Sequence, residues 1–374
     1  MFKNPFIISV IPPDGPFCDR SSEIEQLISY ALAGTNVVIF SPRRFGKTSL
    51  VKRVQSKLAK KDMLTLYADF FGITSIDAVA GKIARSVYAF IRSNESLMKK
   101  AIRLLTTFRP VFKPVEDGSI AMSIEPATPN LHGIDLLDKT LHDLGQFIEK
   151  VGPGNVHIVF DEFQEITELR DKRLEGTLRA HIQFHQSSYF FVGSRRHILL
   201  GMFNERSRPF YQSAQVFELK KLPHGELVEY LMDQFQKGGK RCPEKNAEEI
   251  SLISQQYPYY SQKLALNVFE VSGKVVHAKD IVKAMEIMVD NETYFYQATL
   301  QALAPRQIAL LRALAAEPSK TILSNRYISK HDLGSVGGVQ SALKKLRQLD
   351  LIEKDSDGCR QIVDPIFRIW LQRL

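Results

Sequence analysis

The stretch SPRRFGKTS, residues 41–49, contains the residue types that bind a nucleoside triphosphate. It follows the short apolar run NVVIF at 36–40 and precedes a helical pattern. A loop between a strand and a helix directs free backbone N–H groups and the positive helix end towards one point, which suits an anion. Lys47 would neutralise the terminal phosphates, the Thr48 hydroxyl would bind magnesium, and Gly46 would let the backbone approach closely. The loop therefore predicts a phosphate-binding site.

The first loop position departs from the usual G-x-x-x-x-G-K-[ST] pattern, because Ser41 stands where glycine is common. A small residue is acceptable there if its φ stays negative, since a positive φ is what requires glycine. We therefore interpret the loop as a variant of the pattern. The residues expected to line the nucleotide are Ser41, Pro42, Arg43, Arg44, Phe45, Gly46, Lys47, Thr48 and Ser49.

Two acidic residues follow a second apolar run, VHIVF at 156–160. Ligands bind outside the carboxyl ends of strands in α/β sheets, so acids at this position point to chemistry. Asp161 is placed to hold magnesium, and Glu162 is placed to polarise a water that attacks the γ-phosphate. The alternative is a solvated strand end, which the Lys47 and Thr48 pattern in the same chain disfavours. We see no protease, protein kinase or redox motif that competes with this site.

Arginines near two further strand ends are additional candidates. In GSRRHILL, Ser194 and Arg195 can reach a γ-phosphate, with Arg196 as the adjacent alternative, although a solvated rim is an equal interpretation. In NERSRPF, Arg206 or Arg208 could supply an arginine finger to this site or to a neighbour's. A surface role is favoured for each of these last two.

The composition is that of an ordinary globular protein, with 44% hydrophobic and 24% charged residues among 374. No apolar run approaches the ~18 residues of a membrane helix, and FIISVI near the N-terminus is short for a secretory signal. Cys18, Cys242 and Cys359 are odd in number and far apart, which favours reduced thiols. We therefore expect a cytoplasmic protein without a membrane partner.

Helical patterns separate five short apolar runs of the kind that form a sheet buried on both faces, so a mostly parallel α/β sheet is expected. The runs are NVVIF (36–40), MLTLYADF (63–70), VHIVF (156–160), YFFVG (189–193) and QVFEL (215–219).

Three regions follow from these patterns. Residues 1–222 form the predicted ATPase core, which carries an inserted β-hairpin at about 108–125 that turns at Asp117–Gly118. Residues 223–294 have helical patterns without strands, as in a small helical lid. Residues 295–374 predict a winged helix, with helices at 305–316, 325–332 and 335–349 before two short strands that turn at Asp357–Gly358.

The chain resembles the prokaryotic "archaeal ATPase" family, in the STAND branch of AAA+-type P-loop ATPases. The resemblance covers nearly the whole chain and rests on FCDRSSEIEQL, SPRRFGKTSLV, FRPVFKPVEDGSIAMSIEP, IVFDEFQEI, HIQFHQSSYFFVGSRRHIL, SRPFYQ, YPYYSQKLA and DPIFRIWLQ. It implies an ASCE-type sheet in which the acid-bearing strand adjoins the neighbour of the P-loop strand. A helical lid and a winged helix are implied as well.

The same resemblance implies functional residues that spacing does not reveal. The region from Phe17 to Arg20 would lie near adenine, and Pro258 would contact the nucleotide from the lid. Gln256 replaces the glycine usual two residues before that proline. Arg195 corresponds to the strand-end arginine of related proteins.

The sequence patterns and the resemblance are compatible with two functions. The first is an ATP- and Mg²⁺-dependent switch, an ATPase whose lid and winged helix move with the nucleotide, acting as a homo-oligomer or on a protein effector. The second is a DNA-binding regulator. The winged-helix region holds 12 Lys and Arg against 7 Asp and Glu, and helix 335–349 carries a groove-facing set: Gln340, Lys344, Lys345 and Arg347. Because Leu343, Leu346 and Leu349 predict a buried face on that helix, we favour its docking within the protein.

Overall fold

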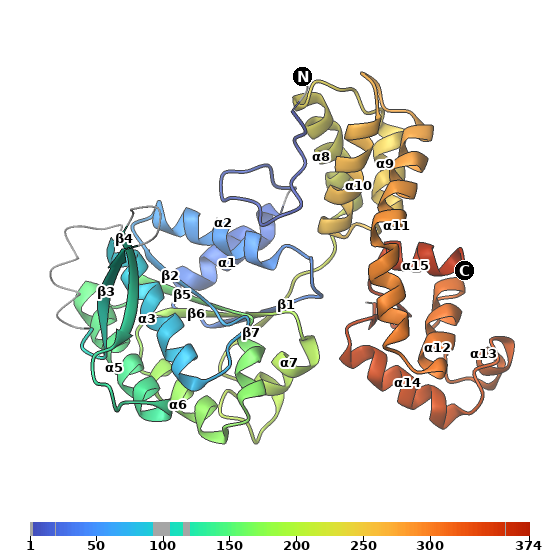
Figure 1. The fold of residues 1–374 in the computed structure, drawn as a ribbon. Helices are drawn as coiled ribbons and strands as arrows, with labels where there is room; N and C mark the ends of the chain where they lie inside the picture. The colour runs from blue at the N-terminus through green and yellow to red at the C-terminus, as the bar shows by residue number, and fades with distance from the viewer. Residues whose placement is uncertain (1–2, 19, 93–104, 115–119, 356) are drawn as a thin grey trace. The chain divides into compact units, whose positions relative to one another are not determined.

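The computed structural model describes residues 3–18, 20–92, 105–114, 120–355 and 357–374 (Figure 1). The chain divides into two compact units. The first, here called the sheet unit, comprises Pro12–Asp14 and Arg20–Lys220. The second, the helical unit, comprises Met1–Ile11, Gly15–Asp19 and Lys221–Leu374.

A five-stranded sheet forms the centre of the sheet unit, in the order β2-β5-β6-β1-β7, with every pair parallel. The predicted parallel α/β fold is thus confirmed, and each of the five apolar runs matches one strand to within one residue at each end. β5, which ends at Asp161, adjoins β6, and β6 adjoins β1, as the resemblance implied. The strands are β1 (Val37–Phe40), β2 (Leu64–Asp69), β5 (Val156–Asp161), β6 (Ser188–Gly193) and β7 (Gln215–Glu218).

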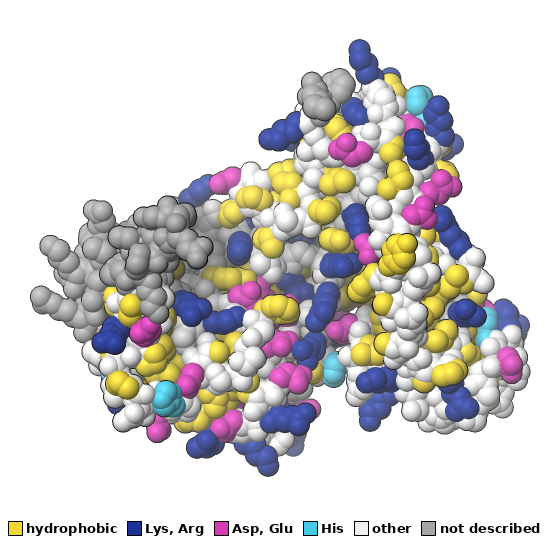
Figure 2. Space-filling model, in the orientation of Figure 1, with side chains coloured by type: hydrophobic (Ala, Val, Ile, Leu, Met, Phe, Trp, Pro, Cys, Tyr) yellow, Lys and Arg dark blue, Asp and Glu magenta, His cyan; other side chains and the backbone are white. Residues whose placement is uncertain are grey.

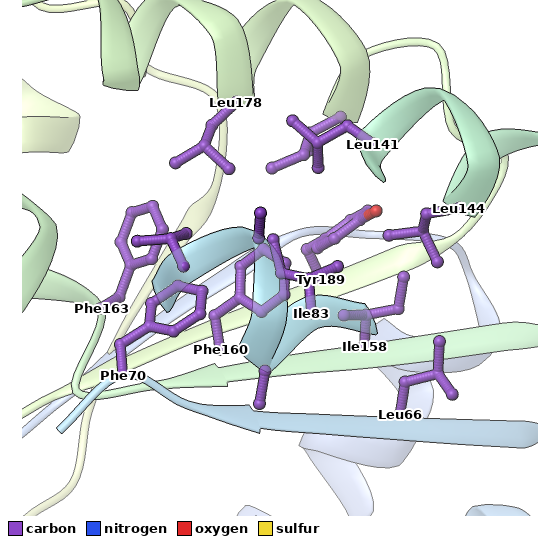
Figure 3. Close-up of a cluster of buried hydrophobic side chains, with 14 of the residues drawn as sticks. Leu66, Phe70, Ile83, Leu141, Leu144, Ile158, Phe160, Phe163, Leu178 and Tyr189 are labelled. Atoms are coloured by element: carbon purple, nitrogen blue, oxygen red, sulfur yellow. The ribbon is translucent and has the colours of Figure 1, made fainter. Parts of the chain in front are cut away.

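Helices cover both faces of this sheet (Figure 1). Strand side chains alternate between faces, so an apolar strand supplies core on both sides. In Figure 3, Leu141 and Leu144 of α5 and Leu178 of α6 lie over Ile158 and Phe160 of β5. The helices on one face are α1 (Ser21–Leu32) and α2 (Lys47–Ala59); those on the other are α3 (Ile76–Arg92), α5 (Gly133–Val151), α6 (Lys172–Ile182) and α7 (Arg196–Asn204).

The predicted β-hairpin is present as β3 (Phe108–Pro114) paired antiparallel with β4 (Ile120–Pro126). The predicted Asp117–Gly118 turn lies outside the described residues. At the hairpin base, Phe108 is buried and its carbonyl accepts a hydrogen bond from the Tyr88 hydroxyl of α3 at 2.6 Å. The base of the hairpin is therefore part of the core.

Residues 223–294, predicted to be helical, contain α8 (His224–Lys237), α9 (Glu244–Ile253), α10 (Pro258–Val271) and most of α11 (Ala278–Gln301). The N-terminal arm packs on them. The Phe6 ring lies 4.9 Å from Phe235 of α8 and 6.4 Å from Phe269 of α10, between ring centroids. α11 continues past residue 294, so it connects the preceding helices to the winged-helix region.

The winged-helix elements follow in the predicted order, and a further helix, α15, succeeds the wing. One detail was wrong: Leu343 and Leu346 are buried, but Leu349 is 44% exposed, because α14 ends at Gln348. The elements are α12 (Pro305–Ala316), α13 (Asn325–Lys330), α14 (Val336–Gln348), β8 (Ile352–Lys354), β9 (Arg360–Ile362) and α15 (Pro365–Gln372). Across the part of the chain that the structure describes, none of the helices combines the length and apolarity needed to span a membrane.

Candidate nucleotide-binding site

Strand register brings the predicted site residues to one edge of the sheet. Asp69 pairs with Asp161 between β2 and β5, and Phe40 pairs with Gly193 between β1 and β6. Because parallel strands all end at the same edge, the segments that follow Phe40, Asp161 and Gly193 start side by side. These segments are the loop with Lys47, the acidic pair and Ser194.

The loop between β1 and α2 has the backbone that an anion site needs. Arg44 and Gly46 adopt left-handed conformations, with φ of 67° and 81°. Ser41 has no such positive φ, which explains why serine is tolerated in place of glycine. The Lys47 side chain is nearly buried, and its Nζ lies 2.9 Å from both the Ser41 and Pro42 carbonyl oxygens. The loop therefore holds an ammonium group at its centre, where it can neutralise phosphate charge.

Asp161 receives hydrogen bonds from two hydroxyl groups on one carboxylate oxygen. Thr48 Oγ1 donates to Oδ2 at 2.8 Å, and Tyr67 Oη donates to the same atom at 2.7 Å. The other oxygen, Oδ1, accepts from the Glu162 N–H at 2.9 Å. Carboxylate and hydroxyl oxygens are the ligands that Mg²⁺ prefers, so Thr48 and Asp161 fit the magnesium role expected of them.

Tyr67 is a residue that the sequence analysis missed. It lies on β2, and burial together with the nearby Asp161 raises its pKa well above the usual value, so the phenol stays protonated and can donate. Its proximity to Asp161 depends on β2 pairing with β5, and the sequence alone did not establish that pairing.

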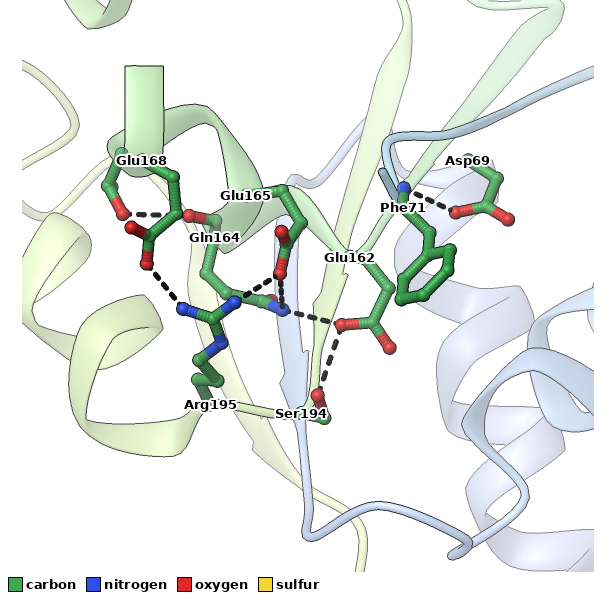
Figure 4. Close-up of polar contacts among 9 residues, drawn as sticks. Asp69, Phe71, Glu162, Gln164, Glu165, Glu168, Ser194 and Arg195 are labelled. Carbon is green, nitrogen blue, oxygen red and sulfur yellow. Dashed lines mark hydrogen bonds and ion pairs between the residues drawn. The ribbon is translucent and has the colours of Figure 1, made fainter. Parts of the chain in front are cut away.

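Glu162 is held by two donors on one oxygen (Figure 4). Gln164 Nε2 lies 2.5 Å and Ser194 Oγ lies 3.1 Å from Glu162 Oε2. The other carboxylate oxygen, Oε1, points away from both donors in this view. Ser194 thus contacts the candidate base directly, a contact that the sequence analysis did not anticipate.

Arg195 contacts acidic residues of the 3₁₀ helix η1 (Phe163–Leu169). Its guanidinium lies 2.7 Å from Glu165 Oε1 and 2.5 Å from Glu168 Oε1 (Figure 4). The adjacent Arg196 pairs instead with Glu218 at 2.9 Å. Of this arginine pair, Arg195 is therefore the one next to the Glu162 network.

The two finger candidates differ in their surroundings. Arg208 forms an ion pair with Glu175 of α6, and its Nε lies 3.0 Å from Glu175 Oε2. Arg206 is exposed. The pairing of Arg208 accords with the surface role favoured for it.

The residues that the resemblance suggested fall in both units. Arg20 is 3% exposed; its guanidinium donates to Glu23 at 3.1 Å and to the Lys220 carbonyl at 2.9 Å. Pro258 opens α10 in the helical unit, where Phe17 also lies. Asp19 lies outside the described residues.

Comparisons with known proteins bear on the fold. The model of a family described as a probable winged helix domain matches residues 294–373. The Walker-type ATPase PABY2304 of Pyrococcus abyssi is similar over 99% of this chain and 100% of its own, with 16% identity and a TM-score of 0.70. The ORC2 protein of Aeropyrum pernix, solved in ADPNP–ADP complexes, is similar over 99% and 97%, with 16% identity and a TM-score of 0.58. None of the curated proteins matches the chain. The chain therefore has the fold of P-loop ATPases, followed by a winged-helix domain.

Proposed function

We propose that the chain binds and hydrolyses ATP with Mg²⁺ as a molecular switch of the AAA+/STAND type, within the "archaeal ATPase" family that its motifs resemble. The observation that carries this proposal is the hydrogen bond between Thr48 and Asp161 beside the ammonium of Lys47. Residues from two segments far apart in the sequence, Lys47 and Thr48 on one side and Asp161 on the other, meet there in the chemistry that a magnesium–triphosphate pair requires.

The binding roles follow from the charges and donors at the sheet edge. The loop 41–49 would surround the phosphates, with Lys47 moving from the loop carbonyls to the terminal phosphates. Thr48 and Asp161 would hold magnesium, whose chemistry is to offset phosphate charge. Tyr67 would keep Asp161 Oδ2 oriented.

The catalytic roles belong to the neighbouring strand ends. Glu162 would accept the proton of the attacking water at Oε1, the oxygen that points away from its two donors. Ser194 and Arg195 would contact the γ-phosphate. For Arg195 this means exchanging its ion pairs with η1 for a phosphate, an exchange between similar charge-assisted contacts.

Coupling to the rest of the chain would run through the lid and the winged helix. We retain the proposed division at 1–222, 223–294 and 295–374, except that the N-terminal arm, Met1–Ile11, belongs to the helical unit. Arg20 and Pro258 are proposed as further nucleotide contacts. A contact within the helical unit supports the coupling: the buried Tyr257, directly before Pro258, donates a hydrogen bond to Glu353 of β8. A lid that follows the nucleotide would therefore move the wing with it. We place the protein in the cytoplasm, because an odd number of widely spaced cysteines favours reduced thiols.

The test is phosphate release from ATP by wild type and by Glu162→Gln. The amide keeps the shape but removes the proton acceptor, so turnover should fall by roughly a hundredfold to ten-thousandfold while ATP stays bound. A variant that turns over ATP at the wild-type rate would exclude Glu162 as the base. Repeating the wild-type assay across protein concentrations shows whether a homo-oligomer or a monomer is active.

A second candidate function, ATP-modulated DNA binding, is favoured by one feature of α14. Gln340, Lys344, Lys345 and Arg347 are all exposed on this helix, as a groove-facing set would be. Adding duplex DNA to the turnover assay tests it, because a DNA-dependent regulator should change its rate when DNA binds.

A further inference from the structure

We propose that Gln164 is a positioning residue that orients Glu162, and that Gly193 lacks a side chain in order to leave room for Gln164. The inference rests on the proposed function, because Glu162 is taken as the base. It assigns a role to two residues for which neither the sequence patterns nor the resemblance supplied one.

The first observation is the direct contact. Gln164 has no exposed surface, and its Nε2 donates to Glu162 Oε2 at 2.5 Å. Glu162 itself has a left-handed backbone, with φ of 49°, so its side chain leaves the strand end in an unusual direction. A long carboxylate side chain has several rotamers, and a fixed donor selects one of them. Gln164 and Ser194 together fix Oε2 and leave Oε1 directed elsewhere (Figure 4).

The second observation concerns the other end of the amide. Among the residues that the structure describes, Gln164 Oε1 is buried and has no hydrogen-bond partner. Leaving a buried acceptor unpaired is unfavourable, and an apolar side chain of similar size would avoid that cost. A residue needed only for packing would therefore not be glutamine. The amide adds the Nε2 contacts, a short one with Glu162 Oε2 at 2.5 Å and a longer one with Glu165 Oε1 at 3.5 Å.

The third observation explains Gly193. A Cβ built at this position would lie 2.0 Å from Gln164 Oε1, 3.1 Å from Gln164 Cδ and 3.2 Å from Leu199 Cδ2. Its backbone has no left-handed φ that would by itself require glycine. Gly193 ends β6 in parallel register with Phe40, a regular strand position. Space for the buried amide is therefore the reason for glycine.

The three observations form one chain of contacts. The absence of a side chain at Gly193 leaves space for Gln164, and Gln164 orients Glu162 through a hydrogen bond to Oε2. The other oxygen of Glu162, Oε1, is then available for proton transfer. Any residue that adds a side chain at position 193 should displace the amide and, through it, the base.

The experiment uses the full chain and four variants: Gln164→Leu, Gln164→Ala, Gly193→Ala and the double variant Gly193→Ala/Gln164→Ala. Gln164→Leu keeps the volume, so the protein should fold and bind ATP within about twofold of wild type. Its kcat should fall about tenfold to a hundredfold, as expected when one hydrogen bond to a charged group is lost. Wild-type kcat in this variant, or an equal loss of ATP affinity, would overturn the positioning role.

The packing of Gly193 against Gln164 can be tested without nucleotide. Denaturant unfolding should show that Gly193→Ala destabilises the wild type much more than it destabilises the Gln164→Ala background. The two Gln164 atoms that the new Cβ meets are then absent, and only the 3.2 Å approach to Leu199 Cδ2, the end of a side chain, remains. Equal destabilisation in both backgrounds would overturn the explanation of Gly193. If the wild type does not hydrolyse ATP, the proposed function fails, and this unfolding cycle still decides whether Gly193 makes room for Gln164.

Discussion

The sheet edge and the surface of α14 both carry basic side chains, but in opposite settings. At the sheet edge Lys47, Asp161 and Ser194 are 6%, 3% and 4% exposed, and each has named hydrogen-bond partners. On α14, Lys344 and Lys345 are exposed. Burying polar groups is costly unless they are paired, whereas exposed lysines cost almost nothing. The buried cluster is therefore the stronger indicator of specific chemistry.

One face of the molecule carries side chains of both charges. On the face shown in Figure 2, Lys and Arg side chains are interspersed with Asp and Glu. Non-specific DNA binding depends on a positive surface that replaces counterions along the phosphate backbone. Variants at the sheet edge should accordingly have larger effects than variants on α14.

The largest effect is expected from Lys47→Ala. Removing the ammonium should weaken ATP binding about a hundredfold or more, because charge-assisted contacts to phosphate are lost. Fluorescence titration with an ATP analogue measures this. Lys57→Ala, at an exposed position of the same helix, is the matched control and should bind like wild type. If Lys47→Ala binds the ATP analogue as tightly as wild type does, ATP does not bind at the sheet edge.

Arg195→Ala should lower kcat by roughly tenfold or more while ADP affinity is retained, since the contact proposed for Arg195 is with the γ-phosphate alone. Arg196→Ala is the control, because Arg196 forms an ion pair with Glu218 at the end of β7. Steady-state turnover and ADP titration separate the two effects. The opposite pattern, with Arg196→Ala the more damaging change, would transfer the role to Arg196.

Tyr67→Phe should raise the Mg²⁺ concentration needed for half-maximal ATP binding about three- to tenfold, because Asp161 loses one of its two hydroxyl donors. ATP binding without metal should be unchanged. Asp161→Asn should give a larger shift in the same direction. A Mg²⁺ titration of both variants measures this, and an unshifted Asp161→Asn curve would contradict the magnesium role.

The smallest effect is expected from the triple alanine variant of Lys344, Lys345 and Arg347. If α14 does not bind DNA, the affinity for duplex DNA should stay unchanged in the variant. If α14 instead docks within the protein, the variant should show altered ATP turnover or nucleotide release. If α14 binds DNA, each lost phosphate contact should reduce the slope of log affinity against log salt concentration by roughly 0.9. Salt-titrated duplex binding distinguishes these outcomes. A steep slope in the wild type that becomes shallower in the variant, with ATP turnover unchanged, would show that α14 binds DNA and does not dock within the protein.

Features encoded locally were predictable from the sequence. Each of the five apolar runs became a strand, and the loop with Lys47 and the strand end with Asp161 meet at one edge because parallel strands end together. The helix at 305–316 was predicted with its observed bounds.

Features that depend on contacts between distant segments were not predictable. Tyr67 reaches Asp161 only because β2 pairs with β5, and the room that Gly193 leaves for Gln164 depends on the fold around η1. The N-terminal arm was predicted to belong to the ATPase core of residues 1–222, yet Phe6 packs on α8 and α10. Such contacts are properties of tertiary packing, which local periodicity does not specify.

The most direct test of the central claim is calorimetric titration of ATP into the wild-type protein, with Mg²⁺ and again with a chelator. We expect one ATP to bind per chain, with affinity that falls at least about tenfold when the metal is withdrawn, since Thr48 and Asp161 would hold magnesium against the phosphates. No binding, or binding of equal affinity with and without the metal, would contradict the assignment of this sheet edge as a magnesium–ATP site.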